Sequence, residues 1–439
     1  MKTGKTLAAL TLAGVLALAG CGGGGTANET TAPPAQDNPV TLTMSGWSLS
    51  TTPEFQTLVD GFKAIQPNVT IQIKEYDANT YEQLLLTDMT AKAAPDIITI
   101  KQAKYTWQWA TKDQLMDVSD LVSALPSSVT GAGSYAVNGK NYGIPYRQDS
   151  WLLFYNKDLF EQADVAVPDG KWTWDDYANT AKELYTDFQE SGTDVKGTYE
   201  HSWQSTLQGF ANAQKGDNTN PTGAYFSGDY SYMLPYYARA LDLQDSGAQI
   251  PMGDITTNKL TYQSQFGQQS TAMMLMGSWY IATLVSQQKS GDADQFAWGM
   301  APAPQVDSST FSDPVTFGDP TGMGINANID SSKLQAAKDF LTYVSSEAAA
   351  KALAGIGITP AMSSDAVTAA VFAGAGLPTD TLSKTAFQTH ETKPENPSGQ
   401  YTMQISTVLN DAHTAIMTES TDAQAALTDA GTKVKNQDW

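Results

Sequence analysis

The sequence predicts an α/β fold built from two lobes, and three observations lead to this prediction. The chain has 439 residues, which is enough for two domains of about 150–200 residues, each with its own core. Segments with the two-residue alternation of strands take turns with segments of helical periodicity. This β-α-β order favours mostly parallel sheets covered by helices.

The first part of the body shows this alternation most clearly. Apolar residues alternate over 40–44 and 69–73, and a short apolar run occupies 97–100, so three strands are expected. Between them, apolar residues recur at helical spacing over 55–65 and 81–89. We therefore predict a β-α-β-α-β unit at the start of the folded chain.

The middle of the chain carries fewer regular signals. A strand is predicted at 151–155, and Thr173 with Asp176 forms the T-x-x-D pattern of a capping box before a helix through Leu184. Residues 190–230 are expected to be irregular, because they are rich in Gly, Asn and aromatic residues. The Met-rich segment 271–279 is expected to lead into another helix.

Two further helical regions are predicted near the end. Asp330 or Ser331 is placed to cap a helix that directs Leu334, Leu341 and Val344 inward. The last 40 residues are also expected to be helical. Their apolar face consists of Ile405, Val408, Leu409, Ala412 and Ile416.

Composition excludes several functional classes. The chain has 46 acidic and 25 basic residues, a net charge of −21, and such a field repels nucleic-acid backbones, so no nucleic-acid partner is expected. It has one cysteine and three histidines, in no spacing that would build a zinc site. We expect neither a metal site nor a cofactor.

The N-terminus predicts export and membrane attachment. Residues 1–20 carry two lysines and then a short apolar run, as in a signal peptide. Cys21 follows them directly, and Leu18–Cys21 resembles the bacterial lipobox, in which the cysteine is lipidated. The alternative is an ordinary secretory signal. Residues 21–39 have the composition of a flexible tether. We therefore expect an extracytoplasmic protein, anchored to the bacterial cell membrane by lipid.

The order of several short motifs points to one family. Tyr142-Gly-Ile-Pro145 is followed by the segment 154–160, FYNKDLF, and by the Trp-Thr-Trp of 172–174. Gly277-Ser-Trp279 and the segment 321–326, TGMGIN, come later. Together these motifs resemble the extracellular solute-binding protein family 1, the carbohydrate-binding components of ATP-driven (ABC) importers. The resemblance covers about residues 40–435.

The resemblance implies a periplasmic-binding-protein-like fold (type II-like) whose lobes close like a hinge. One lobe would comprise 40–148 with 319–358, and the other 149–318 with 359–439. Crossings between them fall near 147–149, 315–320 and 357–360. The implied partners are an oligosaccharide and the membrane permease of an importer, and the binding protein itself acts as a monomer without enzymatic activity.

Aromatic and polar residues near these motifs are the candidate ligand contacts. A sugar ring presents a face of C–H groups that packs on aromatic rings, while its hydroxyls need polar partners. Each candidate could instead be a core, surface or hinge residue. The candidates are Trp47, Gln102, Trp107, Arg147, Asp149, Trp203, Tyr225, Trp279 and Asp319.

Two alternatives remain at this point. A secreted glycosidase is also rich in aromatics and needs two carboxylates across a cleft, but the sequence contains no GxSxG, HExxH or P-loop motif. A binding protein for peptides, polyamines or another non-carbohydrate solute is the closer alternative. The long segment 190–230 favours a ligand larger than a monosaccharide.

Overall fold

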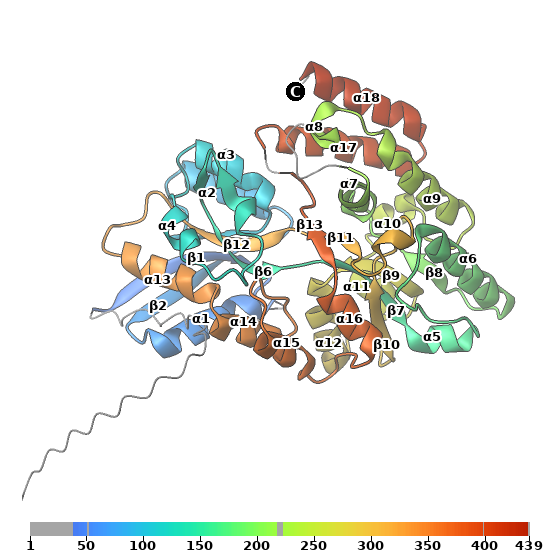
Figure 1. Ribbon diagram of the computed structural model, residues 1–439, viewed down its shortest axis with the longest axis horizontal. Helices are drawn as coiled ribbons and strands as arrows, with labels where there is room; N and C mark the ends of the chain where they lie inside the picture. Colours follow the sequence, from blue (N-terminus) through green and yellow to red (C-terminus); the bar gives the residue numbers. More distant parts are fainter. Residues whose placement is uncertain (1–37, 51, 217–222, 398, 438–439) are drawn as a thin grey trace, which may run out of the picture. The chain divides into compact units, whose positions relative to one another are not determined.

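The structure is a computed structural model (Figure 1), and it describes residues 38–50, 52–216, 223–397 and 399–437. The expected signal peptide, Cys21 and most of the expected tether lie outside the described residues. No helix within the described ranges is long and apolar enough to span a bilayer.

The first sheet has five strands in the order β2-β1-β3-β12-β6. Strand β1 runs parallel to β2 and β3, as predicted, whereas β12 is antiparallel to both β3 and β6. The strands are β1 (Val40–Trp47), β2 (Val69–Tyr76), β3 (Ile97–Ile100), β6 (Ile144–Gln148) and β12 (Pro320–Ile325). The associated helices are α1 (Glu54–Ile65), α2 (Tyr81–Thr90), α3 (Thr106–Thr111), α4 (Ser119–Ser123), α13 (Leu334–Val344) and α14 (Glu347–Ala354).

The second sheet has four strands in the order β10-β7-β9-β8. Strand β7 is antiparallel to both of its neighbours, and all of its residues are buried. The strands are β7 (Trp151–Asn156), β8 (Lys196–Tyr199), β9 (Thr271–Gly277) and β10 (Trp298–Pro302). The first helices of this part are α5 (Lys157–Gln162), α6 (Trp174–Glu190), α7 (Phe210–Gln214), α8 (Ala224–Ser227), α9 (Leu234–Asp245) and α10 (Met252–Thr257). The later ones are α11 (Tyr262–Gly267), α12 (Trp279–Ser290), α16 (Thr381–Gln388), α17 (Thr402–Met417) and α18 (Ala423–Asn436). Helix α15 (Asp365–Phe372) packs against α14 of the first part.

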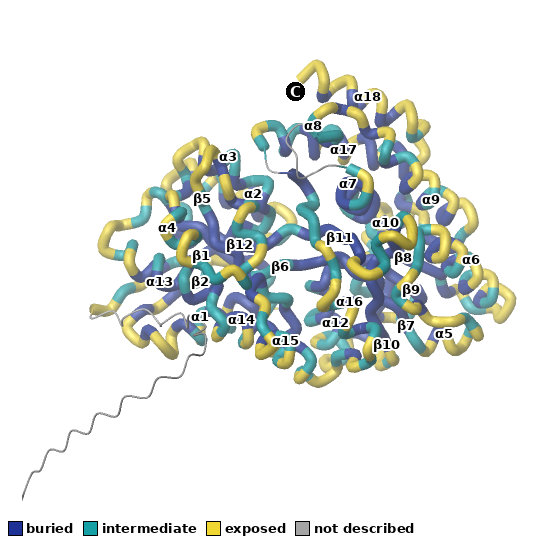
Figure 2. Tube along the Cα trace, viewed as in Figure 1, coloured by how far each residue is buried: buried dark blue, intermediate teal, exposed yellow. Residues whose placement is uncertain are grey.

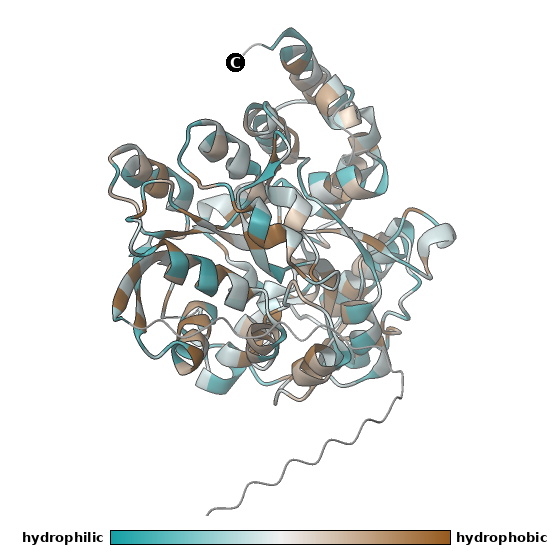
Figure 3. Ribbon diagram, turned by 60° about the vertical axis from the view of Figure 1, so that its left-hand side comes forward, coloured by the Kyte–Doolittle hydropathy of each residue, from teal (hydrophilic) through white to brown (hydrophobic). Residues whose placement is uncertain are grey.

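Each sheet has its own hydrophobic core. One core is formed by residues of β1–β3, their helices and α13–α14, and the other by β7–β10 with α5–α12 and α16–α18. Helix α15 packs against α14 in a smaller third cluster. Figure 2 shows the buried residues concentrated on the strands, with exposed residues on the outer helix faces. Figure 3 shows hydrophilic and hydrophobic residues mixed along the same helices, as expected for amphipathic elements. We call the parts around the first and second sheets the first and second lobes.

Three crossings connect the lobes. Strand β6 of the first sheet continues through Asp149 and Ser150 into β7 of the second. The short strand β11 (Val315–Phe317) pairs with β13 (Glu391–Lys393) and leads back into β12. The third crossing lies alongside the first, where the Gln148 N–H donates to the Thr359 carbonyl at 3.1 Å. A small hairpin of β4 (Ala136–Val137) and β5 (Lys140–Asn141) completes the strands.

One local prediction from the sequence is confirmed by the structure, and two others are wrong in whole or in part. The capping box of Thr173 and Asp176 is present, with both reciprocal bonds formed at the start of α6. The cap predicted at Asp330 or Ser331 is wrong: α13 begins after Lys333, since the Asp330 carboxylate instead accepts bonds from the N–H and hydroxyl of Ser332. The prediction that 190–230 is irregular is also wrong in part. This segment contains β8, a π-helical turn at Ser205–Gly209, α7 and α8.

Candidate functional site

An aromatic cluster in the second lobe contains two of the predicted ligand contacts. Trp203 is 40% exposed, and its ring centre lies 5.6 Å from that of Tyr262 and 6.5 Å from that of Trp279. Tyr262 begins α11 and Trp279 begins α12, so two helix starts and one loop bring these rings together. We call Trp203, Tyr262 and Trp279 the aromatic wall.

Neighbouring side chains fix the aromatic wall from behind. The buried Trp151 of β7 packs edge-on against Trp279, with ring centres 5.6 Å apart. The His201 ring packs edge-on against Trp203 at 4.4 Å, and its Nδ1 lies 2.7 Å from the Tyr199 hydroxyl. Burial lowers the pKa of His201 to about 4, so this ring is neutral near pH 7.

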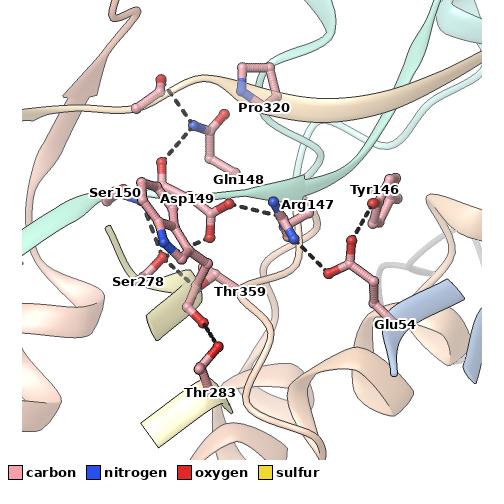
Figure 4. A network of polar contacts seen from close by, with 12 residues as sticks. Glu54, Tyr146, Arg147, Gln148, Asp149, Ser150, Ser278, Thr283, Pro320 and Thr359 are labelled. Carbon is pink, nitrogen blue, oxygen red and sulfur yellow. Dashed lines mark hydrogen bonds and ion pairs between the residues drawn. The ribbon is translucent and has the colours of Figure 1, made fainter. Parts of the chain in front are cut away.

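A buried ion-pair network occupies the first crossing (Figure 4). The Arg147 guanidinium lies between two carboxylates: its Nη1 is 2.5 Å from Glu54 Oε2, and its Nε is 2.8 Å from Asp149 Oδ2. The Tyr146 hydroxyl donates to the other Glu54 oxygen at 2.7 Å. Glu54 is fully buried at the start of α1 in the first lobe, and Asp149 is 3% exposed. The network thus ties the first crossing to the first lobe.

The charges in this network follow from burial and pairing. Burial raises the pKa of Asp149, and the attraction of Arg147 offsets only part of that rise. Burial alone would lower the pKa of Arg147, but Asp149 and Glu54 raise it above its ordinary value. Arg147 is therefore a permanent cation whose charge is shared between two carboxylates, which suits a structural role.

The network continues into the second lobe through Ser278 (Figure 4). The Ser278 hydroxyl donates to Asp149 Oδ1 at 3.0 Å and accepts from the Ser150 N–H at 3.3 Å. The Thr359 hydroxyl, on the third crossing, donates to the Ser278 hydroxyl oxygen at 2.9 Å. Ser278 directly precedes Trp279 of the aromatic wall.

An acidic pair lies at the second crossing. The Glu395 N–H donates to Asp319 Oδ1 at 2.9 Å, and the Ser205 hydroxyl donates to Glu395 Oε1 at 2.7 Å. Burial and repulsion from Glu395 raise the pKa of Asp319 to about 7. Asp319 therefore exchanges its proton near neutral pH.

A contact between the lobes lies close in sequence to both Trp203 and Gln102. Lys104, which follows β3, places its Nζ 3.4 Å from the Ser406 hydroxyl of α17. The Gln204 amide donates to the same hydroxyl at 3.1 Å. The carboxyl end of β3 in the first lobe thus meets the start of the π-helical turn in the second.

The other predicted residues are divided between surface and core. Gln102 and Trp107 are half-buried after β3. Trp47 is only 7% exposed and packs edge-on against Phe55 and Tyr81. Tyr225 is 1% exposed, and its hydroxyl donates to Asn396 and to the Thr402 carbonyl. Both Trp47 and Tyr225 are core residues in this structure.

Sequence reasoning missed four residues of these networks. Glu54 was interpreted as a helix-start residue stabilised by the helix dipole, whereas it is fully buried and paired with Arg147. Tyr262, Ser278 and Glu395 were not singled out. Ser278 lies inside the Gly277-Ser-Trp279 motif, so the sequence did offer a signal for it. Nothing in the local sequence marks Glu395, because its partner Asp319 is distant in the chain.

Two α/β lobes joined by several crossings define a periplasmic-binding-protein-like fold. A family model described as bacterial extracellular solute-binding protein matches residues 48–351, which is more than half of the chain. The chain belongs to this family of solute-binding proteins.

Individual relatives agree with this assignment. An uncharacterized lipoprotein encoded in the oleD 5′ region of Streptomyces antibioticus is 29% identical over 191 residues, 42% of this chain and 40% of the relative. An arabinooligosaccharide-binding protein of Halalkalibacterium halodurans is 28% identical over 106 residues, 24% of each chain. The matches thus span less than half of these curated relatives.

Solved structures match over most of the chain. The crystal structure of a sugar transporter from Rhizobium etli in an open conformation is 28% identical, with a TM-score of 0.75. That match covers 90% of this chain and 99% of the Rhizobium chain. The similarity therefore includes both lobes.

Proposed function

We propose that this protein captures a carbohydrate between its two lobes and delivers it to the membrane permease of an ATP-driven importer. The observation that carries the proposal is the aromatic wall, in which the partly exposed Trp203 stands beside Tyr262 and Trp279. A group of neighbouring, partly exposed aromatic side chains is a common mark of a ligand-binding site. The face of a sugar ring is a ligand that packs on such side chains.

Polar residues of the first lobe and of the crossings complete the proposed site. Gln102 and Trp107 follow β3 at its carboxyl end, where ligand contacts are common in α/β sheets. Asp319 at the second crossing supplies carboxylate oxygens for sugar hydroxyls. Arg147 and Asp149 contribute by holding the first crossing, since each is already engaged by buried partners. Trp47 and Tyr225 are not part of the proposed site, because both are buried in the cores.

Closure of the lobes retains the ligand in this proposal. The lobes comprise 40–148 with 319–358 and 149–318 with 359–439, and the three crossings bend as a hinge. Sugar contacts from both lobes stabilise the closed form, which the permease then recognises. An oligosaccharide is the preferred ligand, in keeping with the arabinooligosaccharide-binding relative.

Membrane attachment through Cys21 is part of the proposal. The lipobox-like sequence ahead of Cys21 supports it, as does similarity to a lipoprotein of Streptomyces antibioticus. The protein then acts outside the cytoplasm as a tethered monomer. Replacing Cys21 by Ser should release the protein from the membrane fraction, and continued membrane association of that variant would contradict lipid attachment at this residue.

Calorimetric titration with mono- and oligosaccharides tests the binding function. We expect one-to-one binding of at least one oligosaccharide at micromolar or tighter affinity, with the sugar recovered unchanged. Trp279→Ala should abolish most of that affinity. Turnover of the sugar would instead favour an enzyme, and the absence of binding across α- and β-glucans, xylo-, fructo- and galacto-oligosaccharides would favour a non-carbohydrate solute.

A further inference from the structure

We propose that Ser278 is a positioning residue that couples the hinge to Trp279 of the aromatic wall. This inference rests on the proposed function for its consequence in ligand binding, but its structural part can be tested without ligand. Ser278 lies at the end of β9 and is 1% exposed. Its side chain therefore acts only on its protein neighbours.

The hydroxyl of Ser278 is fully used by the hinge. A serine hydroxyl has one donor and two acceptor positions. Here the donor serves Asp149, and the two acceptor positions serve the Ser150 N–H and the Thr359 hydroxyl. The Ser278 N–H also donates to the Ser150 carbonyl at 2.9 Å. One side chain thus joins the first and third crossings.

The same hydroxyl does not cap its own helix. Ser278 occupies the N-cap position of α12, where a serine side chain ordinarily accepts a bond from the first turn. No such bond is formed, because the side chain is directed to the crossings instead. Helix α12 therefore lacks the stabilisation of a side-chain cap, and the hydroxyl that could provide it bonds to the hinge.

Gly277 explains why the coupling reaches the ring of Trp279. The indole folds back over the end of β9, and a Cβ at position 277 would lie 1.9 Å from a ring carbon of Trp279. Only glycine allows this close approach. The three residues Gly277, Ser278 and Trp279 therefore form one unit, in which the first admits the ring, the second binds the hinge and the third faces the proposed ligand.

The unit is also connected to the first lobe. Asp149, which accepts from Ser278, pairs with Arg147, and Arg147 pairs with Glu54 at the start of α1. A rotation of the lobes about the crossings must move Asp149 and Thr359 relative to the second sheet. Because Ser278 bonds to both, it transmits that movement to the orientation of Trp279.

Near-ultraviolet circular dichroism tests this role without a ligand. The contribution of Trp279 is obtained as wild type minus Trp279→Phe, and it is measured again in the Ser278→Ala and Thr359→Val backgrounds. Thr359→Val removes only one of the three bonds. It is therefore the milder test, and it still applies if the Ser278→Ala variant does not fold. Ser286→Ala, an exposed serine of the same helix, is the matched control.

We expect the Trp279 contribution to weaken or change sign in both hinge variants and to stay unchanged in Ser286→Ala. Sugar affinity should fall about tenfold or more in Ser278→Ala, because this change removes all three bonds that orient the residue before Trp279. Leu284→Ala, a core change in α12, should lower the melting temperature without this loss of affinity.

Two results would overturn the inference. One is an unchanged Trp279 signal in both hinge variants. The other is a loss of affinity in Leu284→Ala equal to that in Ser278→Ala, because Ser278 would then act through stability alone. If the wild-type protein binds no sugar, the proposed function fails, while the dichroism comparison still decides the role of Ser278.

Discussion

Trp203 and Trp47 have similar sequence surroundings but differ in how far they are exposed in the structure. Both are tryptophans next to expected loops, yet Trp203 is 40% exposed and Trp47 is 7% exposed. Trp47 ends β1 and is covered by Phe55 of α1 and Tyr81 of α2. The residue type alone predicted that each ring could stack on a sugar. Whether the ring is exposed depends on which helices, distant in sequence, pack over it.

Buried partners were the part of the site that sequence could not reveal. Arg147 and Asp149 were predicted as candidates, and both take part in the network of the first crossing. Glu54 lies 93 residues before Arg147 in the chain and 92 residues before Tyr146, and it contacts both. No local pattern encodes such a contact, because it is created by the packing of α1 against β6.

Replacing Trp203 tests the exposed part of the aromatic wall. Trp203→Ala should weaken sugar binding by about tenfold or more, since an aromatic–sugar stacking surface would be lost. The melting temperature should change little because the ring is partly exposed. Trp203→Phe, which keeps an aromatic face, should retain part of the affinity. Calorimetric affinities equal to wild type in both variants would remove Trp203 from the site.

Asp319 should make stability depend on pH. Its pKa rises from 3.8 to about 7 in the folded protein because of burial and Glu395. The native state therefore holds a proton that the unfolded chain releases between these values, so this contribution to stability is present at low pH and lost as the pH rises toward 7.

Asp319→Asn removes that dependence while keeping an oxygen for the Glu395 N–H. Relative to wild type, the variant should gain on the order of 2 kcal/mol in free energy of unfolding between pH 5 and pH 8. Urea denaturation at the two pH values measures this difference. The same pH dependence in variant and wild type would show that Asp319 is ionised throughout.

At the scale of elements, periodic segments were predicted well and short ones were not. The strands and helices between 40 and 100, β7, and the helical C-terminus all lie where the apolar spacing places them. Strand β8 and helices α7 and α8 were missed because each has only four or five residues. Such runs are too short to display a period, and their structure comes from burial in the second core.

The capping box of α6 gives a prediction at this scale. Thr173→Ala should lower the free energy of unfolding by about 1 kcal/mol, because the Asp176 N–H at the helix start loses the threonine hydroxyl that accepts its hydrogen bond. Sugar affinity should stay unchanged, since α6 contributes no residue to the proposed site. Thr173→Ser is the control that keeps the hydroxyl. Urea denaturation with no difference between alanine and serine would argue against this cap.

At the scale of the whole molecule, the crossings determine how the two lobes are connected. The sequence predicted where the chain crosses between lobes only through the family resemblance, because crossing strands look like any other strand. The structure adds the connections that hold them together: Arg147 with two carboxylates, and Ser278 with Asp149 and Thr359. These bonds connect the start of α1 in the first lobe, through the first and third crossings, to the start of α12 in the second.

An interlobe distance measures directly whether a sugar draws the two lobes together. With Cys21 replaced by Ser no other cysteine remains, so spin labels can be placed at Gln83→Cys in α2 and Glu183→Cys in α6, both exposed. Pulsed electron paramagnetic resonance then gives the distance distribution with and without the sugar that binds in calorimetry. We predict a shift to a shorter, narrower distribution at saturating sugar, and none in Trp279→Ala. An unchanged distribution in the fully liganded wild-type protein would contradict closure of the lobes on the ligand.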